Sequence, residues 1–170
     1  FEVVPETQDV LSEEAAYVTV NLLQGVTKAG SGARLRHAGL EKTSYVYEKV
    51  ITGYPYVFEN PIAGKTGTTQ NQSDGWFMGM VPNLATGVWV GGEDRAVHFK
   101  DIAFGQGATM ALPIWAVYMK QLYEDPNLGI SLEDFTAPET LTIAIECEEL
   151  DEEGEVKKSK PKADLDALGF

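Results

Sequence analysis

The stretch Gly64-Lys65-Thr66-Gly67-Thr68-Thr69 stands directly before two strand-like runs, Trp-Phe-Met-Gly-Met-Val at 76–81 and Thr-Gly-Val-Trp-Val at 86–90. The links between these segments, 71–75 and 82–85, are short and rich in turn-forming residues. Successive strands that are joined by such short links pair side by side in opposite directions. The sequence from Ile62 to Val90 therefore predicts an antiparallel meander of three strands.

The middle strand of this meander is apolar on both of its faces. Because side chains alternate along a strand, its residues divide into two sets: Trp76, Met78 and Met80 on one face, and Phe77, Gly79 and Val81 on the other. A strand of this kind is typical of a sheet that is covered on both sides. We therefore expect an α+β fold, in which helices pack on the faces of an antiparallel sheet.

Two segments have the features of helices that would cover the sheet. The first begins at Ser12, which suits the N-cap position and is followed by two glutamates, and it ends near Gly25. The second extends from Ala111 to Tyr123, with Pro113 in its first turn and a proline soon after its end. The residues expected to face the core recur at helical spacing: Ala15, Val18, Leu22 and Val26 in the first helix, and Ile114, Val117, Tyr118, Gln121 and Leu122 in the second.

The Lys-Thr-Gly triplet gives the first strand a chemistry suited to binding a peptide. Lys65 supplies a compact, mobile cation that can hold a carboxylate, and the hydroxyls of Thr66 and Thr68 add hydrogen-bond donors. Gly67 removes the side chain that would keep a second backbone away from the strand. These residues therefore predict an edge strand that binds and orients a peptide while a nucleophile from elsewhere attacks it.

Three consecutive segments extend the pattern: AGKTGTT at 63–69, DGWFMG at 74–79 and PNLATGVWVG at 82–91. Further matching residues lie upstream, within 16–34, and downstream, at Gly105 and 111–115. In this order the segments closely resemble the C-terminal part of the transpeptidase domain of bifunctional, class A penicillin-binding proteins, and the resemblance covers most of residues 11–123. It implies a penicillin-binding, β-lactamase-like domain.

The resemblance also implies a reaction and a role for each residue of the triplet. In these enzymes a serine attacks the penultimate D-Ala carbonyl of a peptidoglycan stem peptide, and β-lactams imitate that donor. Lys65 would anchor the terminal carboxylate together with Thr66 and Thr68, while Gly67 and Thr69 complete the substrate-binding strand. The backbone N–H of Thr68 would be the catalytic group here, because it would form an oxyanion hole with the N–H of the serine.

Two further motifs of the family do not precede Lys65 in this sequence. The nucleophile of the family lies in Ser-x-x-Lys and a second element in Ser-x-Asn, both N-terminal to Lys-Thr-Gly. The only Ser-x-x-Lys match is at 159–162, in a charged segment where Pro161 opposes a helix, and we interpret it as a coincidence. We therefore expect the chain to be the C-terminal piece of a longer protein, with the N-terminal half of the same domain as its partner and with no activity by itself.

Composition excludes several other classes of function. A net charge of −13 argues against binding to nucleic acid, and no cofactor or metal motif is present. His37 and His98 are isolated, Glu93-Asp94 is typical of a polar turn, and Cys147 has no partner for an intrachain disulfide. We expect no membrane contact by this segment, within a parent protein anchored in the cytoplasmic membrane and facing the periplasm or cell envelope.

The C-terminal part of the sequence changes in character. Leu141, Ile143 and Ile145 alternate with polar residues, which predicts one more strand. Beyond Glu146 the sequence is rich in Glu, Asp and Lys, which is typical of a solvated segment. We therefore divide the chain into a transpeptidase portion, 1–146, and an acidic, flexible tail, 147–170.

Two other hypotheses for the function of these residues remain open. A non-catalytic module that kept only the peptide-binding Lys-Thr-Gly strand would have the same sequence features. In a purely structural domain the triplet would be incidental. The reading frame upstream of Phe1 distinguishes these possibilities, since a Ser-x-x-Lys and Ser-x-Asn pair there would identify the enzyme.

Overall fold

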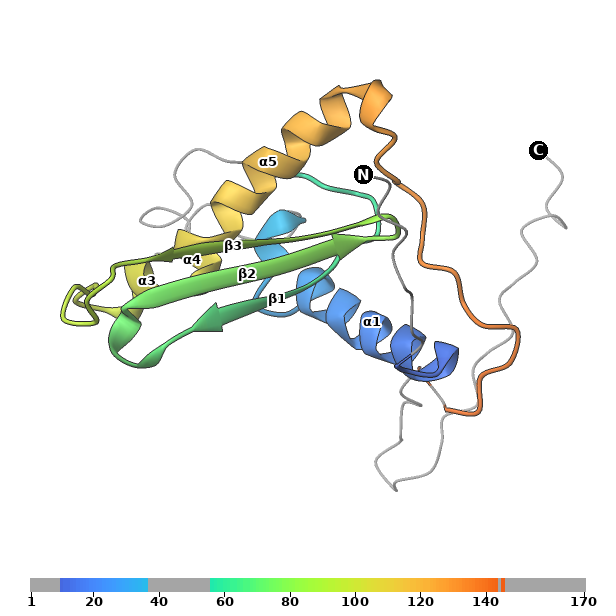
Figure 1. The fold of residues 1–170 in the computed structure, drawn as a ribbon, viewed down its shortest axis with the longest axis horizontal. Helices are drawn as coiled ribbons and strands as arrows, with labels where there is room; N and C mark the ends of the chain where they lie inside the picture. The colour runs from blue at the N-terminus through green and yellow to red at the C-terminus, as the bar shows by residue number, and fades with distance from the viewer. Residues whose placement is uncertain (1–9, 37–55, 144, 146–170) are drawn as a thin grey trace, which may run out of the picture. The chain divides into compact units, whose positions relative to one another are not determined.

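The computed structural model describes residues 10–36, 56–143 and 145. The chain divides into two compact units, Phe1–Thr140 and Leu141–Phe170. In the first unit, a helix precedes a sheet of three strands, and further helices follow it (Figure 1). The helices are α1 (Glu13–Lys28), α3 (Ile102–Gly105), α4 (Gly107–Met110) and α5 (Leu112–Glu124), with short 3-10 turns η1 (Ala33–Leu35), η2 (Gln70–Gln72) and η3 (Pro126–Leu128).

The sheet is the antiparallel meander that the sequence predicts. Its strands are β1 (Ala63–Thr68), β2 (Asp74–Val81) and β3 (Leu84–Gly91), and they pair in the order β1-β2-β3. The register places Lys65 opposite Met78 and Gly67 opposite Trp76. Directly opposed residues share a face, so Lys65 and Gly67 lie on the face of Trp76, and Thr66 and Thr68 lie on the face of Phe77. The α+β fold with an antiparallel sheet is confirmed.

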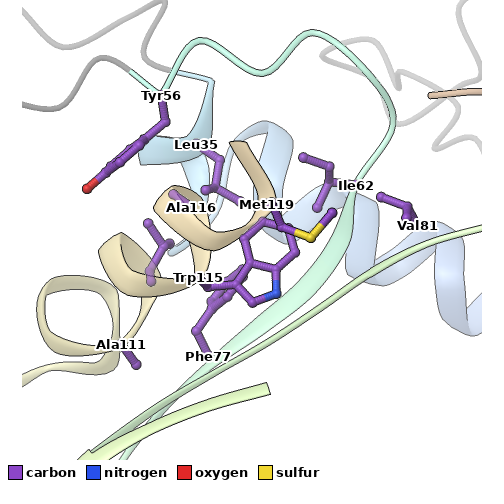
Figure 2. Packing of buried hydrophobic residues seen from close by; sticks show 10 residues of the cluster. Leu35, Tyr56, Ile62, Phe77, Val81, Ala111, Trp115, Ala116 and Met119 are labelled. Carbon is purple, nitrogen blue, oxygen red and sulfur yellow. The ribbon is translucent and has the colours of Figure 1, made fainter. Parts of the chain in front are cut away.

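One face of the sheet, called here the inner face, carries the core. Phe77 and Trp115 are fully buried, and their ring centroids lie 5.1 Å apart with the edge of one ring against the face of the other (Figure 2). Met119 of α5 and Val81 of β2 belong to the same cluster. The indole Nε1 of Trp115 donates a hydrogen bond of 2.7 Å to the Thr86 hydroxyl. Helix α5 is thus fixed on the sheet by packing and by one polar contact.

The opposite face, called here the open face, is covered less than the sequence predicts. Trp76, Met78 and Trp89 are 44%, 45% and 47% exposed. The two tryptophans lie against each other, with ring centroids 6.4 Å apart. The alternation of residues is confirmed, but the expected equal coverage is not found in the described part of the chain. An apolar face indicates that a strand can be covered on that side, but it does not identify the segment that covers it.

Helix α1 begins where the sequence predicts and ends later. The Ser12 hydroxyl accepts a hydrogen bond from the Ala15 N–H, as an N-cap does. The helix continues past Gly25 to Lys28, because a single helical glycine costs only about 1 kcal/mol and the last turn is anchored. The Thr27 hydroxyl, which is fully buried there, donates to the Ile62 carbonyl at 2.5 Å.

The core-facing side of α1 agrees with the prediction only in part. Ala15, Val18 and Val26 are half-buried, but Leu22 is 70% exposed, and the buried residues are Gln24 and Thr27. The side chain of Gln24 donates to Asp134 at 2.9 Å and accepts from Lys28 at 3.2 Å. Buried polar groups are tolerated when they are hydrogen-bonded, and a search for apolar spacing does not find them.

Helix α5 occupies the predicted segment but presents another side to the core. It spans Leu112–Glu124, has Pro113 in its first turn and ends before Pro126. Four members of the predicted stripe are exposed, Ile114, Val117, Tyr118 and Gln121. The buried residues are instead Leu112, Trp115, Ala116 and Met119. Because the helix has apolar residues on most sides, the choice depends on its fit to the sheet: a Cβ at Gly79 would lie 2.3 Å from the ring of Trp115, so the glycine makes room for this side chain.

Within the second unit the structure describes Leu141–Ile143 and Ile145 and assigns no strand to them. The prediction of a strand from this alternation is therefore wrong for these residues. Leu141 and Ile143 are 37% and 50% exposed, so the alternating residues do not form a buried face. A strand requires a pairing ladder as well as alternation. His37, Cys147, the match at 159–162 and the proposed tail from 147 lie outside the described residues.

Candidate functional site

Lys65 lies on β1, at an edge of the sheet in the described part of the chain, and its side chain is exposed. Its Nζ donates a hydrogen bond of 2.7 Å to the carbonyl oxygen of Thr66. This contact bends the side chain from the open face toward the outer side of the strand. An ammonium group has three donors, so two remain for an acceptor that approaches the edge of β1.

The backbone of β1 directs hydrogen-bonding groups toward the same edge. The Thr69 N–H donates to the Asp74 carbonyl at 3.1 Å, across the position that continues the ladder with β2. In antiparallel pairs, residues that bond to the partner alternate with residues that point away from it. Thr68 and Thr66 therefore direct their N–H and C=O groups away from β2, consistent with the contact between Lys65 and the Thr66 carbonyl.

The hydroxyls of the two threonines lie on the inner-face side and have partners from other elements. The Thr66 hydroxyl is 2.6 Å from the Ser31 hydroxyl, and either oxygen can be the donor. The Thr68 hydroxyl accepts a hydrogen bond of 3.0 Å from the N–H of Gly107, at the beginning of α4. The structure thus gathers Lys65, Thr66 and Thr68 at one edge, with both hydroxyls held in place.

Gly67 and Thr69, the other predicted site residues, have different surroundings. A Cβ at Gly67 would lie 3.1 Å from the Cβ of Trp76, which leaves little room on the open face. The Thr69 hydroxyl accepts from the Asp74 N–H at 2.9 Å and lies 3.0 Å from the Ser73 hydroxyl. It therefore stabilises the turn between β1 and β2, where Asn71 and Gln72 have positive φ angles.

Sequence reasoning did not single out Ser31 and Gly107 as contributors to this edge. Ser31 lies between two glycines in the turn after α1, and Gly107 lies in a short helix that follows the sheet. Ser31 belongs to the upstream residues that carry the family resemblance, but the sequence assigned no role at this edge to it or to Gly107. Contacts between hydroxyls that are far apart in the chain appear only after folding.

Several other polar groups that could suggest a functional site take part in local contacts. Among the described residues, no group of three or more His, Cys, Asp or Glu side chains is arranged to hold a metal ion. The Asp94 carboxylate accepts from the Ala96 N–H at 2.8 Å within a turn, and a ring nitrogen of His98 is 2.9 Å from the Phe99 carbonyl. Burial lowers the pKa of Arg34 below its ordinary value, with a smaller opposing influence from Tyr56.

Comparison with known proteins finds relatives that share one name, penicillin-binding protein 1A. Penicillin-binding protein 1A of Aquifex aeolicus is 33% identical over 152 residues, which cover 85% of this chain and 18% of that protein. Penicillin-binding protein 1A of Pseudomonas aeruginosa is 34% identical over 119 residues, 70% of this chain and 12% of the relative. The protein of the same name from Clostridium acetobutylicum is 27% identical, over 80% of this chain and 13% of its own length. No family model matches the chain.

The chain thus spans less than one fifth of the length of these relatives. In its described part, no helix is both long enough and apolar enough to cross a membrane. The chain therefore corresponds to a part of a class A penicillin-binding protein.

Proposed function

We propose that this chain is the C-terminal portion of a serine D,D-transpeptidase domain that cross-links peptidoglycan stem peptides, and that β1 is its substrate-binding strand. The edge of β1 carries this proposal. There, the ammonium of Lys65 and the outward N–H of Thr68 belong to one edge strand, at the two residues of that strand that are exposed. A peptide that adds to a strand edge gains main-chain hydrogen bonds, and local side chains select its end.

In the proposed reaction, β1 binds and polarises the donor peptide. Lys65 and the hydroxyls of Thr66 and Thr68 hold the terminal carboxylate, and Gly67 and Thr69 complete the strand. The Thr68 N–H donates to the carbonyl oxygen of the penultimate D-Ala, where negative charge develops during acylation. The attacking serine comes from the N-terminal half of the domain. D-Ala leaves, and an amine of a second stem peptide accepts the acyl group. A β-lactam enters the same place and keeps the serine acylated.

The location of the parent protein follows from this substrate. Stem peptides are cross-linked outside the cytoplasmic membrane, so we place the chain at the periplasmic or cell-envelope face, within a parent that is anchored in the membrane. The edge of β1 requires no cofactor for this role, since acyl transfer proceeds through the serine.

Replacement of Lys65 in the longer protein tests the proposal. Lys65→Ala should lower the rate of acylation by a fluorescent penicillin about 10-fold or more, since a hydrogen bond to a charged group contributes about 1.5–3 kcal/mol. The melting temperature should change little, because an exposed lysine contributes little to folding. Lys100→Ala, at another exposed lysine, is the matched control. Unchanged acylation with a large loss of melting temperature would make Lys65 a structural residue.

A second experiment separates this function from a non-catalytic peptide-binding module. The isolated chain should form no covalent adduct with the same penicillin, because β1 positions a carbonyl and supplies no activated nucleophile. Addition of a polypeptide that carries Ser-x-x-Lys and Ser-x-Asn, the N-terminal half of the domain, should produce labelling. A stoichiometric adduct with the isolated chain would contradict the proposed division of the site.

A further inference from the structure

We propose that Ser31 and Arg34, in the turn after α1, are positioning residues that orient the hydroxyls of Thr66 and Thr68 toward the carboxylate of the bound peptide. The inference rests on the proposed function of β1. It adds a second segment of the chain to the site, one that lies more than thirty residues before the strand. Ser31 acts directly on Thr66, whereas Arg34 acts on Thr68 through α4.

The first connection joins Ser31 to Thr66. The two oxygens are 2.6 Å apart, and both side chains are at the surface. A hydroxyl has one proton and two acceptor lone pairs. When Ser31 donates to the Thr66 oxygen, the proton of Thr66 is left for another acceptor. An anionic carboxylate at the edge of β1 is such an acceptor, and it favours this direction of the pair.

The position of Ser31 is fixed by the backbone around it. The N–H of Gly32 donates to the Val26 carbonyl at 3.0 Å, and a Cβ at Gly30 would lie 2.9 Å from the Cα of Val26. The turn is therefore folded closely onto the end of α1. The buried hydroxyl of Thr27 in turn joins α1 to the Ile62 carbonyl, one residue before β1. These contacts fix the distance between Ser31 and β1, as a positioning role requires.

The second connection runs from Arg34 to α4. One guanidinium nitrogen, Nη1, donates to both the Ala108 carbonyl and the Thr109 hydroxyl, each at 3.0 Å. Arg34 is partly buried, so its side chain has little freedom to leave these acceptors. A helix of four residues has little stability by itself. The arginine therefore holds α4 against the turn that follows α1.

Helix α4 then contacts Thr68. The Gly107 N–H donates to the Thr68 hydroxyl oxygen at 3.0 Å. A Cβ at Gly107 would lie 2.2 Å from the Gly67 carbonyl oxygen and 2.4 Å from that of Trp76, so the backbone of α4 rests directly on the sheet. Because the N–H occupies one lone pair of Thr68, the hydroxyl proton is directed elsewhere. When Ser31 is the donor to Thr66, both threonines accept from another segment and present a proton, as a carboxylate site requires.

The test compares two ligands in the longer, acylation-competent protein. Acylation rates are measured with benzylpenicillin, which has a carboxylate, and with its methyl ester, which has none. Ser31→Ala should lower the rate for benzylpenicillin about 5- to 20-fold and the rate for the ester less than about 2-fold, because the lost orientation matters most for an anionic acceptor. Ser31→Thr keeps the hydroxyl and should restore the benzylpenicillin rate. Thr19→Ala is the control, since that hydroxyl bonds only within α1.

The branch through Arg34 has its own variants. Arg34→Ala should reduce the ratio of the benzylpenicillin rate to the ester rate about 3- to 10-fold. Arg34→Lys should restore this ratio only in part, because lysine lacks the planar guanidinium group. Thr109→Val removes one of the two acceptors with a smaller change of charge and volume, and should lower the ratio about 2- to 3-fold. If Arg34→Ala does not fold, Thr109→Val decides this branch.

The outcomes distinguish this inference from the proposed function. Equal losses for the two ligands, or failure of Ser31→Thr to restore the rate, would mean that the turn has a general structural role, and the inference would be overturned. Unchanged rates in all these variants would also overturn the inference, provided that Lys65→Ala lowers the rate of acylation as expected. If Lys65→Ala also has no effect on acylation, the proposed function of β1 itself fails.

Discussion

The inner and open faces of the sheet are made by alternate residues of the same three strands, yet their surroundings differ. On the inner face, Phe77 is fully buried against Trp115, and glycines allow α4 and α5 to approach closely. On the open face, Trp76 and Met78 are half-exposed in the described part of the chain. The helices therefore fix the sheet from one side.

This difference is important for β1, which takes part in both faces. Its inner-face residues, Thr66 and Thr68, are held by hydroxyl and backbone contacts, while Lys65 and Gly67 belong to the open face. Packing on one side can thus hold the strand rigid while its edge and other side stay accessible. A binding strand needs both properties, because fixed donors lose little freedom when a ligand binds.

The largest expected difference between the faces concerns the aromatic residues of β2. Phe77→Ala should lower the free energy of unfolding by about 3–5 kcal/mol, because it leaves a cavity beside Trp115. Trp76→Ala, on the adjacent residue, should lower it by less than about 2 kcal/mol, because its ring is already half in water. Urea unfolding of the full chain measures both values. Equal losses would show that the open face is buried in solution.

Two glycines provide a second comparison with the same chemical change. Gly79→Ala should cost about 2–4 kcal/mol, because the new methyl group would meet the ring of Trp115, which has no room to move. Gly87→Ala should change stability by about 0.5 kcal/mol or less, because its methyl group would meet the end of the Met78 side chain, which is flexible and exposed. Thermal melts measure both variants. A comparable loss of stability at Gly87 would show that the Met78 side chain is not free to move on the open face.

The hydrogen bond between α5 and the inner face is expected to make an intermediate contribution to stability. Thr86→Val should lower stability by about 1–2 kcal/mol, because the Nε1 of Trp115 loses its acceptor in a buried position. Thr86→Ser keeps the hydroxyl and should cost less than about 1 kcal/mol. Chemical denaturation, with tryptophan fluorescence as the signal, measures both variants. If the two are equally destabilised, the methyl group of Thr86 contributes as much as its hydroxyl, and the hydrogen bond is not the main contribution of this residue.

At Gly67 a small effect on stability is expected together with a large effect on function. Gly67→Val should change the free energy of unfolding by about 1 kcal/mol or less, since the new Cβ meets only the side chain of Trp76, whose nearest atom, its Cβ, is 3.1 Å away, and valine favours strands. In the longer protein, the same change should abolish acylation by penicillin, because the side chain obstructs a ligand on β1. Parallel melting and labelling assays test this prediction. Retained labelling would remove Gly67, and with it the strand Lys65–Thr69, from the proposed site.

The elements of the fold could largely be predicted from the sequence, but not the sides that they bury. The strands, their antiparallel order and the alternation of Trp76 and Phe77 agree with the structure. The predicted face of α5 does not, because this helix has apolar residues on several sides, and that of α1 agrees only in part, because its most buried residues, Gln24 and Thr27, are polar. The strand predicted at 141–145 is also not found among the described residues there. Local spacing identifies an element, whereas its buried side depends on the shape of what it meets.

The sequence by itself determined that Lys65, Thr66, Gly67 and Thr68 belong to one strand, since a short polar triplet before a meander has few other arrangements. Only the tertiary structure decided what holds them. The Ser31 hydroxyl, the Gly107 N–H and the side of α5 that carries Trp115 reach the sheet through contacts between residues far apart in the chain. Such contacts depend on the packing of complete elements in three dimensions, and neither residue type nor local spacing encodes them.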